Sequence, residues 1–138
     1  MTDKTLELAG ISLRAVADCQ DVIERHCASS RHTHFVCLSS VDGRLLGIAG
    51  NGDRTLGQRV AAMSSSLLGL AESMSRETLR DTARYNLVAS NQGSIVLVRV
   101  PSASSKFVLA LCADSVETVA LALRNALDVA DATAKFLP

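Results

Sequence analysis

Five residues that can bind metal ions lie close together near the start of the chain, and zinc binding is the chemistry they would support. They are His26, Cys27, His32, His34 and Cys37. Zinc ligands usually come in Cys-x-x-Cys or His-x-x-x-His pairs, and neither spacing is present. On a helix, His26 and Cys27 would also point about 100° apart. We therefore expect no metal site, but a solvated histidine-rich loop with Cys37 in the core of a strand.

A serine run and a glycine-rich segment are the next candidates for chemistry. Ser64-Ser65-Ser66 falls inside a helical pattern, where a serine lacks the strained turn that exposes a nucleophile. Gly47, Gly50 and Gly52 follow a hairpin strand without the Lys-Ser/Thr pair of a P-loop or the spacing of a dinucleotide fingerprint. No base or oxyanion motif accompanies either segment. The sequence therefore predicts a protein that is not an enzyme, binds no nucleotide itself and has no cofactor.

Arginines gather near both ends of the expected central helix. Arg54 and Arg59 lie at its start, and Arg76, Arg80 and Arg84 lie at or after its end. Such charges usually form only a solvated surface. The alternative is a contact surface for an acidic protein partner, and these five residues are our candidate for it.

Composition excludes several classes of function. The 138 residues are 48% hydrophobic and 20% charged, which indicates a single folded domain over residues 1–138. Fourteen basic residues balance fourteen acidic ones, so neither nucleic acid nor an anionic membrane is an expected partner. Aromatic residues make up only 3%, too few for base-stacking surfaces. With no signal peptide or membrane span in the pattern, we expect a cytoplasmic protein with four reduced cysteines.

The hydrophobic pattern predicts three helices and five strands in the order α-β-β-α-β-β-β-α. Hairpin connections favour a five-stranded antiparallel sheet flanked by the helices, an α+β sandwich. After a short tail at residues 1–10, we expect a helix over 11–30, strands over 35–41 and 44–49, a helix from 55 to about 77 or 80, strands over 84–90, 94–100 and 106–113, and a last helix from 114 to about 136.

Two local features carry definite geometric expectations. Asp42-Gly43 is typical of a two-residue type I′ hairpin turn, which needs positive φ at both central residues. Asp53 or Thr55 is expected to cap the central helix. Asp114 is expected to cap the last helix, with Glu117 completing a capping box.

The central helix carries two stripes. We assign the stripe of large side chains to the protein's own sheet. The stripe of small side chains either allows close packing within one subunit or meets a second subunit, and we favour the second because two-fold dimers are the commonest assemblies. The large stripe is Leu56, Val60, Met63, Leu67, Leu70 and Met74, at heptad spacing, and the small stripe is Ala62, Ser66, Gly69 and Ser73.

These elements resemble the Roadblock / dynein light chain family over roughly residues 33–135. The resemblance is carried by the segments Ser40-Val41-Asp42-Gly43, Val60-Ala61-Ala62-Met63, Gly93-Ser94-Ile95-Val96-Leu97-Val98 and Phe107-Val108-Leu109-Ala110-Leu111. It implies a Roadblock/profilin-like fold and a homodimer in which the third strands pair and the central helices lie side by side. By position, the dimer helix is Thr55 to Glu77 and the pairing strand is Arg84 to Ser90. The implied dimer interface is Gln58, Ala62, Ser66, Gly69, Ser73, Tyr85, Leu87 and Ala89.

The resemblance also implies a function. Family members bind Ras-like small GTPases or act as non-catalytic subunits and adaptors. We therefore expect a homodimeric regulator that binds a Ras-like GTPase and modulates its nucleotide cycle. The alternatives are a small-ligand sensor, which would need an internal pocket, and a structural scaffold subunit on a profilin-like fold.

Overall fold

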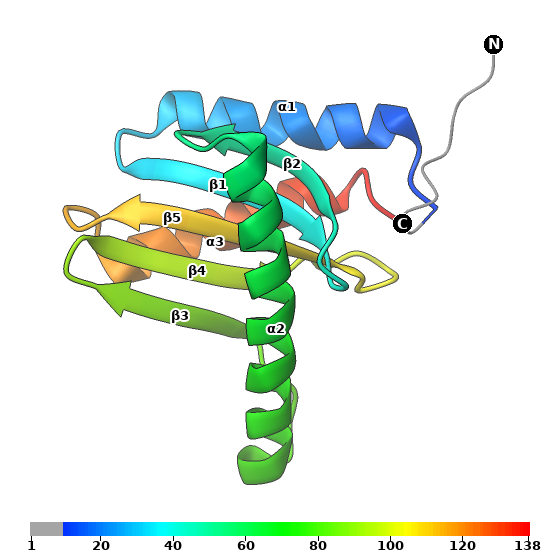
Figure 1. Cartoon of the computed structure of the whole chain (residues 1–138), viewed down its shortest axis with the longest axis vertical. Coiled ribbons are helices and arrows are strands. Elements are labelled where there is room, and N and C mark those ends of the chain that lie inside the picture. Colours follow the sequence, from blue (N-terminus) through cyan, green and yellow to red (C-terminus); the bar gives the residue numbers. More distant parts are fainter. Residues whose placement is uncertain (1–9) are drawn as a thin grey trace.

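The computed structural model describes residues 10–138, which form a five-stranded antiparallel sheet with helices on both faces (Figure 1). The predicted order of helices and strands is confirmed. The elements are α1 (Leu13–Ser29), β1 (Thr33–Ser40), β2 (Leu45–Gly50), α2 (Arg54–Leu79), β3 (Tyr85–Ser90), β4 (Gly93–Arg99), β5 (Phe107–Asp114) and α3 (Val119–Ala134). The tail predicted for residues 1–10 falls almost wholly outside the described residues. Between residues 10 and 138, no helix is long and apolar enough to cross a lipid bilayer.

The strands lie in the order β2-β1-β5-β4-β3, and each neighbouring pair is antiparallel. β1 and β5 are central and buried on both faces, which explains their unbroken apolar sequences. β2 and β3 are the two edges of the sheet. β3 differs from the central strands because five of its six residues are exposed.

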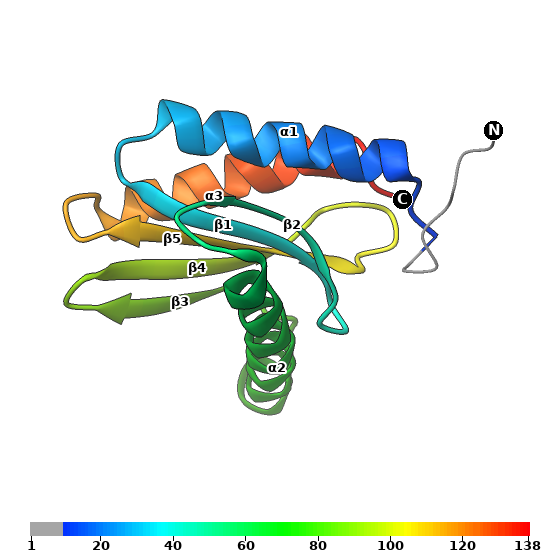
Figure 2. The ribbon, with the colours of Figure 1, turned by 45° about the horizontal axis from the view of Figure 1, so that its top comes forward.

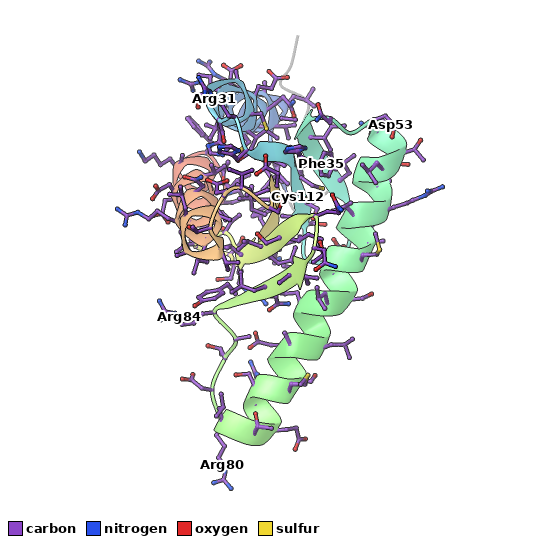
Figure 3. The ribbon with its side chains drawn as sticks, turned by 90° about the vertical axis from the view of Figure 1, so that its left-hand side faces the viewer. Arg31, Phe35, Asp53, Arg80, Arg84 and Cys112 are labelled. Atoms are coloured by element: carbon purple, nitrogen blue, oxygen red, sulfur yellow. The ribbon has the colours of Figure 1, made fainter. Side chains whose placement is uncertain are left out.

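The two faces of the sheet are covered unequally. α1 and α3 lie together on one face, and α2 lies alone on the other (Figures 2 and 3). The face under α1 and α3 holds the larger core, which includes Val36, Leu38, Leu109 and Leu111. The core under α2 is smaller and is built around Phe35. A single helix therefore leaves part of the second face uncovered.

The β1–β2 hairpin differs from the predicted turn. Gly43 has a φ of +92°, but Asp42 is not among the described residues with positive φ, so the type I′ prediction is wrong. Gly43 N donates to Ser40 O at 3.0 Å, and Ser40 N donates to Arg44 O at 2.9 Å. This is a longer loop that ends in a left-handed glycine, and the pairing register shifts beside it, between Leu38 and Ser39.

The two predictions for helix caps have different outcomes. Asp53 caps α2 as expected and accepts from Leu56 N at 2.8 Å. Asp114 does not cap α3, because that helix begins five residues later and Thr118 caps it. Asp114 instead ends β5, and its Oδ1 accepts from Val116 N at 3.0 Å and from Glu117 N at 3.3 Å. The carboxylate thus stabilises a turn between strand and helix, a role for which Asp is equally suited.

Candidate dimer interface and partner surface

The residues of α2 that face the sheet are mostly small. The buried residues of this helix are Gly57, Ala61, Ser64 and Leu68, which repeat at helical spacing. A Cβ atom on Gly57 would lie 2.6 Å from Cγ2 of Ile48, so the missing side chain lets the helix approach the sheet closely. The sheet-facing stripe is therefore a third one, which the sequence reasoning did not identify.

The assignment of the large stripe to the sheet is wrong for all of its residues except Val60, which is half-buried against the core under α2. Met63, Leu70 and Met74 are 61%, 63% and 68% exposed. The large stripe lies about 110° around the helix from the sheet-facing residues, since each residue advances the helix by about 100°. With Gly57 and Ala61 against the sheet, the large side chains point sideways along its surface.

The small stripe is exposed as well. Ala62, Ser66, Gly69 and Ser73 all lie on the solvent side of α2, and Gln58 is exposed beside them. A Cβ atom on Gly69 would meet no atom of residues 10–138 within 4 Å. These residues therefore do not serve close packing within the subunit, and their contact with a second subunit stays a prediction.

An apolar groove runs beside α2 along the sheet. On the sheet side it is formed partly by Val88 and Ile95, which are 39% and 38% exposed. Its volume is about 180 Å³, below the roughly 300–1,000 Å³ of small-molecule pockets. The groove therefore suits a row of side chains from another helix better than a free ligand. It is lined by Val60, Met63, Ser64, Leu67, Val88, Ile95, Leu97 and Cys112.

The second half of α2 extends past the edge of the sheet (Figure 1). Asn86 Nδ2 on β3 donates to Leu67 O at 3.2 Å, which places Leu67 over the last strand. Beyond it the helix continues to Leu79, where Arg80 adopts a left-handed conformation with φ of 57°. The projecting part carries exposed Leu70, Met74 and Leu79, large apolar side chains with no sheet of their own to cover.

The β3 edge is open, whereas one backbone acceptor of the β2 edge is already bonded to a side chain. β3 has neither proline nor lysine, the residues that commonly prevent edge strands from pairing. Tyr85, Leu87 and Ala89, predicted to lie at the interface, are exposed along it. At β2, Gln20 Nε2 from α1 donates to Ile48 O at 2.6 Å, so a side chain occupies an acceptor of that edge strand.

The five arginines do not form one patch within a subunit. Arg54 begins α2, and Arg80 follows its last residue, about 39 Å away along a 26-residue helix. Figure 3 shows Arg80 at the tip of the projecting helix and Arg84 back beside the sheet. Arg76 is within 3.5 Å of Glu72 in the same helix. Any partner surface made from this whole set must therefore be long, or must combine two subunits.

The histidines form a structured group that the sequence reasoning missed. Asp114 Oδ2 lies 3.0 Å from His32 Nδ1 and 3.3 Å from His34 Nε2. The hydrogen bond with His32 is the largest cause that lowers the pKa of Asp114; desolvation opposes it, and the weaker hydrogen bonds with His34 and two backbone amides lower the pKa further, to about 2. His26 Nε2 lies 2.9 Å from Thr33 Oγ1, and burial lowers the pKa of this imidazole. Among residues 10–138, no three His, Cys, Asp or Glu side chains are grouped so that they could hold a metal ion.

The cysteines lie in apolar surroundings. Burial raises the pKa of Cys37 to about 12 and that of Cys19 to about 11, and it also raises the pKa of Cys112. These thiols stay protonated near neutral pH, so they are poor nucleophiles. Cys37 and Cys112 lie in strands, as predicted, and act as small apolar side chains.

Comparison with known proteins identifies the architecture. The Roadblock/LC7 domain model matches residues 21–113. Among solved structures, MglB of Myxococcus xanthus superposes with a TM-score of 0.76 at 15% identity, covering 87% of each chain. A Roadblock/LC7 domain from Streptomyces avermitilis gives 0.76 at 18% identity, covering 85% of this chain and 95% of that one. The gliding protein MglB of Thermus thermophilus gives 0.77 at 9% identity, covering 94% and 95%. No curated protein sequence matches significantly.

Proposed function

This chain belongs to the Roadblock/LC7 domain family, and we propose that it acts as a non-catalytic homodimer that binds a Ras-like small GTPase and modulates its nucleotide cycle. The observation that supports this most strongly is the uncovered apolar surface of α2 and the sheet. It runs from the large stripe of α2, across the groove, to the open β3 edge. Contiguous apolar surface of this kind is typical of protein interaction sites.

A two-fold axis at the β3 edge would cover this surface. Antiparallel pairing of β3 with the partner's β3 extends the sheet to ten strands and satisfies the free backbone groups of both edges. Because the axis is then perpendicular to the sheet, both α2 helices lie on the same face and run in opposite directions. The projecting half of each α2 passes over the sheet of the other subunit. There Leu70 and Met74 can enter the partner's groove.

The GTPase role rests on the family and on the shape of such a dimer. The two α2 helices would form a rigid platform on one face of the joined sheet, with Arg54, Arg59, Arg76, Arg80 and Arg84 as candidates for contacts with the acidic surface of the GTPase. A regulator of this kind needs no catalytic group of its own. It shifts a nucleotide-dependent conformational equilibrium only if it binds one state of the GTPase more tightly than the other.

Capture experiments with Ras-like small GTPases test this proposal. The purified chain is immobilised, and each GTPase is applied loaded with GDP or with a non-hydrolysable GTP analogue. We expect capture that depends on the nucleotide state, and we expect it to be lost when Arg80 and Arg84 are both changed to glutamate. Absence of binding in both states, or equal binding in both, would contradict the proposed function.

A further inference from the structure

The heptad spacing of the large stripe of α2 determines how two copies of this helix would pack together. Val60, Leu67 and Met74 repeat at seven-residue intervals, and Met63 and Leu70 occupy the second position of the same repeat. In an antiparallel pair of helices, a residue at the first heptad position of one helix packs against a residue at the second heptad position of the other. Leu67 then packs against Leu70 of the partner subunit, and Met63 against Met74 of the partner subunit. These layers place the two-fold axis between residues 68 and 69.

The sheet gives an independent estimate of the same position. Leu67 lies over β3, to which it is bonded through Asn86. A two-fold axis between paired edges lies about 2.4 Å beyond the β3 backbone, half the spacing of neighbouring strands. α2 runs across the strands (Figure 1), and each of its residues advances about 1.5 Å. The axis is therefore expected to cross α2 shortly after Leu67, in line with the heptad layers.

The same register places a charged residue at each end of the apolar seam, which is the row of contacts between the two large stripes. Glu77 occupies the next position of the heptad after Leu70, where it would oppose Val60 of the partner subunit. Arg59 precedes Val60 and lies on the same flank of the helix as Glu77, since residues 18 apart are separated by five whole turns. Both side chains are exposed, and neither makes an ion pair within residues 10–138. The acid that interrupts the apolar seam is thus matched by a base that has no ion-pair partner among residues 10–138.

We propose that Arg59 of each subunit forms an ion pair with Glu77 of the partner subunit, and that these two symmetric pairs fix the register of the α2 helices. This inference rests on the proposed homodimer. Charged residues that flank an apolar seam set the choice of partner in paired helices. The pair therefore makes the interface selective for a second copy of this chain over related domains that lack either charge.

Charge exchange tests the pairing directly. Arg59→Glu and Glu77→Arg each place two like-charge contacts where two attractive ones were, and we expect each to raise the dimer dissociation constant about ten-fold, in line with exposed ion pairs. The double variant restores both attractions, so its dissociation constant should return to within about three-fold of the native value. Arg54→Glu is the matched control, because Arg54 lies beyond the seam, and it should change dimerisation little.

Mixing the two single variants gives a sharper readout. A heterodimer of Arg59→Glu with Glu77→Arg regains an attractive pair at both ends, so the mixture should associate more tightly than either variant alone. Sedimentation at low and high salt measures this, and the differences should shrink in about 1 M salt, where the Debye length is about 3 Å. The pairing is overturned if the single changes have no effect, or if neither the double variant nor the mixture recovers association. A native dimer with no recovery overturns only this pairing, whereas a native monomer overturns the proposed dimer too.

Discussion

Changing Leu70 to glutamate should separate the two subunits without unfolding either one. Leu70 is 63% exposed in the single subunit and lies beside the proposed two-fold axis. Burying a whole leucine side chain contributes about 1.5–3 kcal/mol, so burying this exposed part contributes about 1–2 kcal/mol in each subunit. Losing both copies costs about 2–4 kcal/mol, which raises the dimer dissociation constant about 30- to 1,000-fold. The two glutamates, each close to the axis, add repulsion.

Sedimentation equilibrium of the native chain and the Leu70→Glu variant over a range of concentrations measures this change. Leu121→Glu is the control, because Leu121 is 50% exposed on α3, on the opposite face of the sheet. We expect the control to dimerise like the native chain. Circular dichroism should show the same helix content in all three proteins. An unchanged dissociation constant for Leu70→Glu would refute the assignment of the large stripe to the interface.

Four further changes probe other parts of the molecule. Ser66→Arg should weaken dimerisation measured by sedimentation, because the small stripe flanks the seam; an unchanged dimer would remove Ser66 from the interface. Gly57→Ala should destabilise the fold by about 1–3 kcal/mol in chemical denaturation, since its Cβ would press on Ile48, whereas Gly69→Ala, whose Cβ would meet no described atom of its own subunit, should be neutral or stabilising by up to about 1 kcal/mol. The reverse order would contradict the observed face of α2. The pKa of Asp114 is lowered from its usual 3.8 to about 2, so its ionised form stabilises the fold above pH 3.8 and this contribution is lost as the pH falls towards 2. Denaturation at pH 4 and pH 2 should therefore show a smaller loss of stability in Asp114→Asn than in the native chain, and equal losses would argue against the contacts with His32 and His34.

Most of the fold could be predicted because it depends on local patterns. The strands have short apolar runs bounded by turn residues, and the helices have clear periodicity, so element order and approximate bounds followed from neighbours in sequence. The β1–β2 turn was predicted incorrectly because Asp42-Gly43 also fits a longer loop with a single left-handed residue. Asp114 was misassigned for a similar reason, since the same side chain can cap a helix or stabilise a turn.

The orientation of α2 could not be obtained from hydrophobicity alone. The usual rule places the largest apolar side chains against the protein's own core, which selects Met63, Leu67 and Leu70. The structure instead uses Gly57, Ala61, Ser64 and Leu68 for that contact, and at Gly57 the close approach to β2 leaves no room for a side chain. Small residues give a weak hydrophobic signal, so the hydrophobic periodicity did not identify this face of the helix. The 4-3 spacing of the large stripe was the available clue, because it is more typical of helix pairs than of helices on sheets.

The contacts between segments that are distant in the sequence could not be predicted either. The group of His32, His34 and Asp114 joins residues 80 or more positions apart and depends on the pairing of β1 with β5. The open edge at β3 likewise follows only from the order of the strands in the sheet. Of the predicted interface residues, Tyr85, Leu87 and Ala89 lie along that edge, but Val88 and Ile95, which line the groove, were not singled out.

The most direct test of the proposed function is the affinity of the dimer for a Ras-like small GTPase in its two nucleotide states. Titration of each form with the native chain, and with Leu70→Glu as the monomeric comparison, measures both the preference and its dependence on assembly. We expect the native chain to bind one nucleotide state at least about ten-fold more tightly, and we expect Leu70→Glu to lose this binding. Equal affinity for the two states, no binding to either, or undiminished binding by the monomeric variant would contradict a dimeric regulator of such a GTPase.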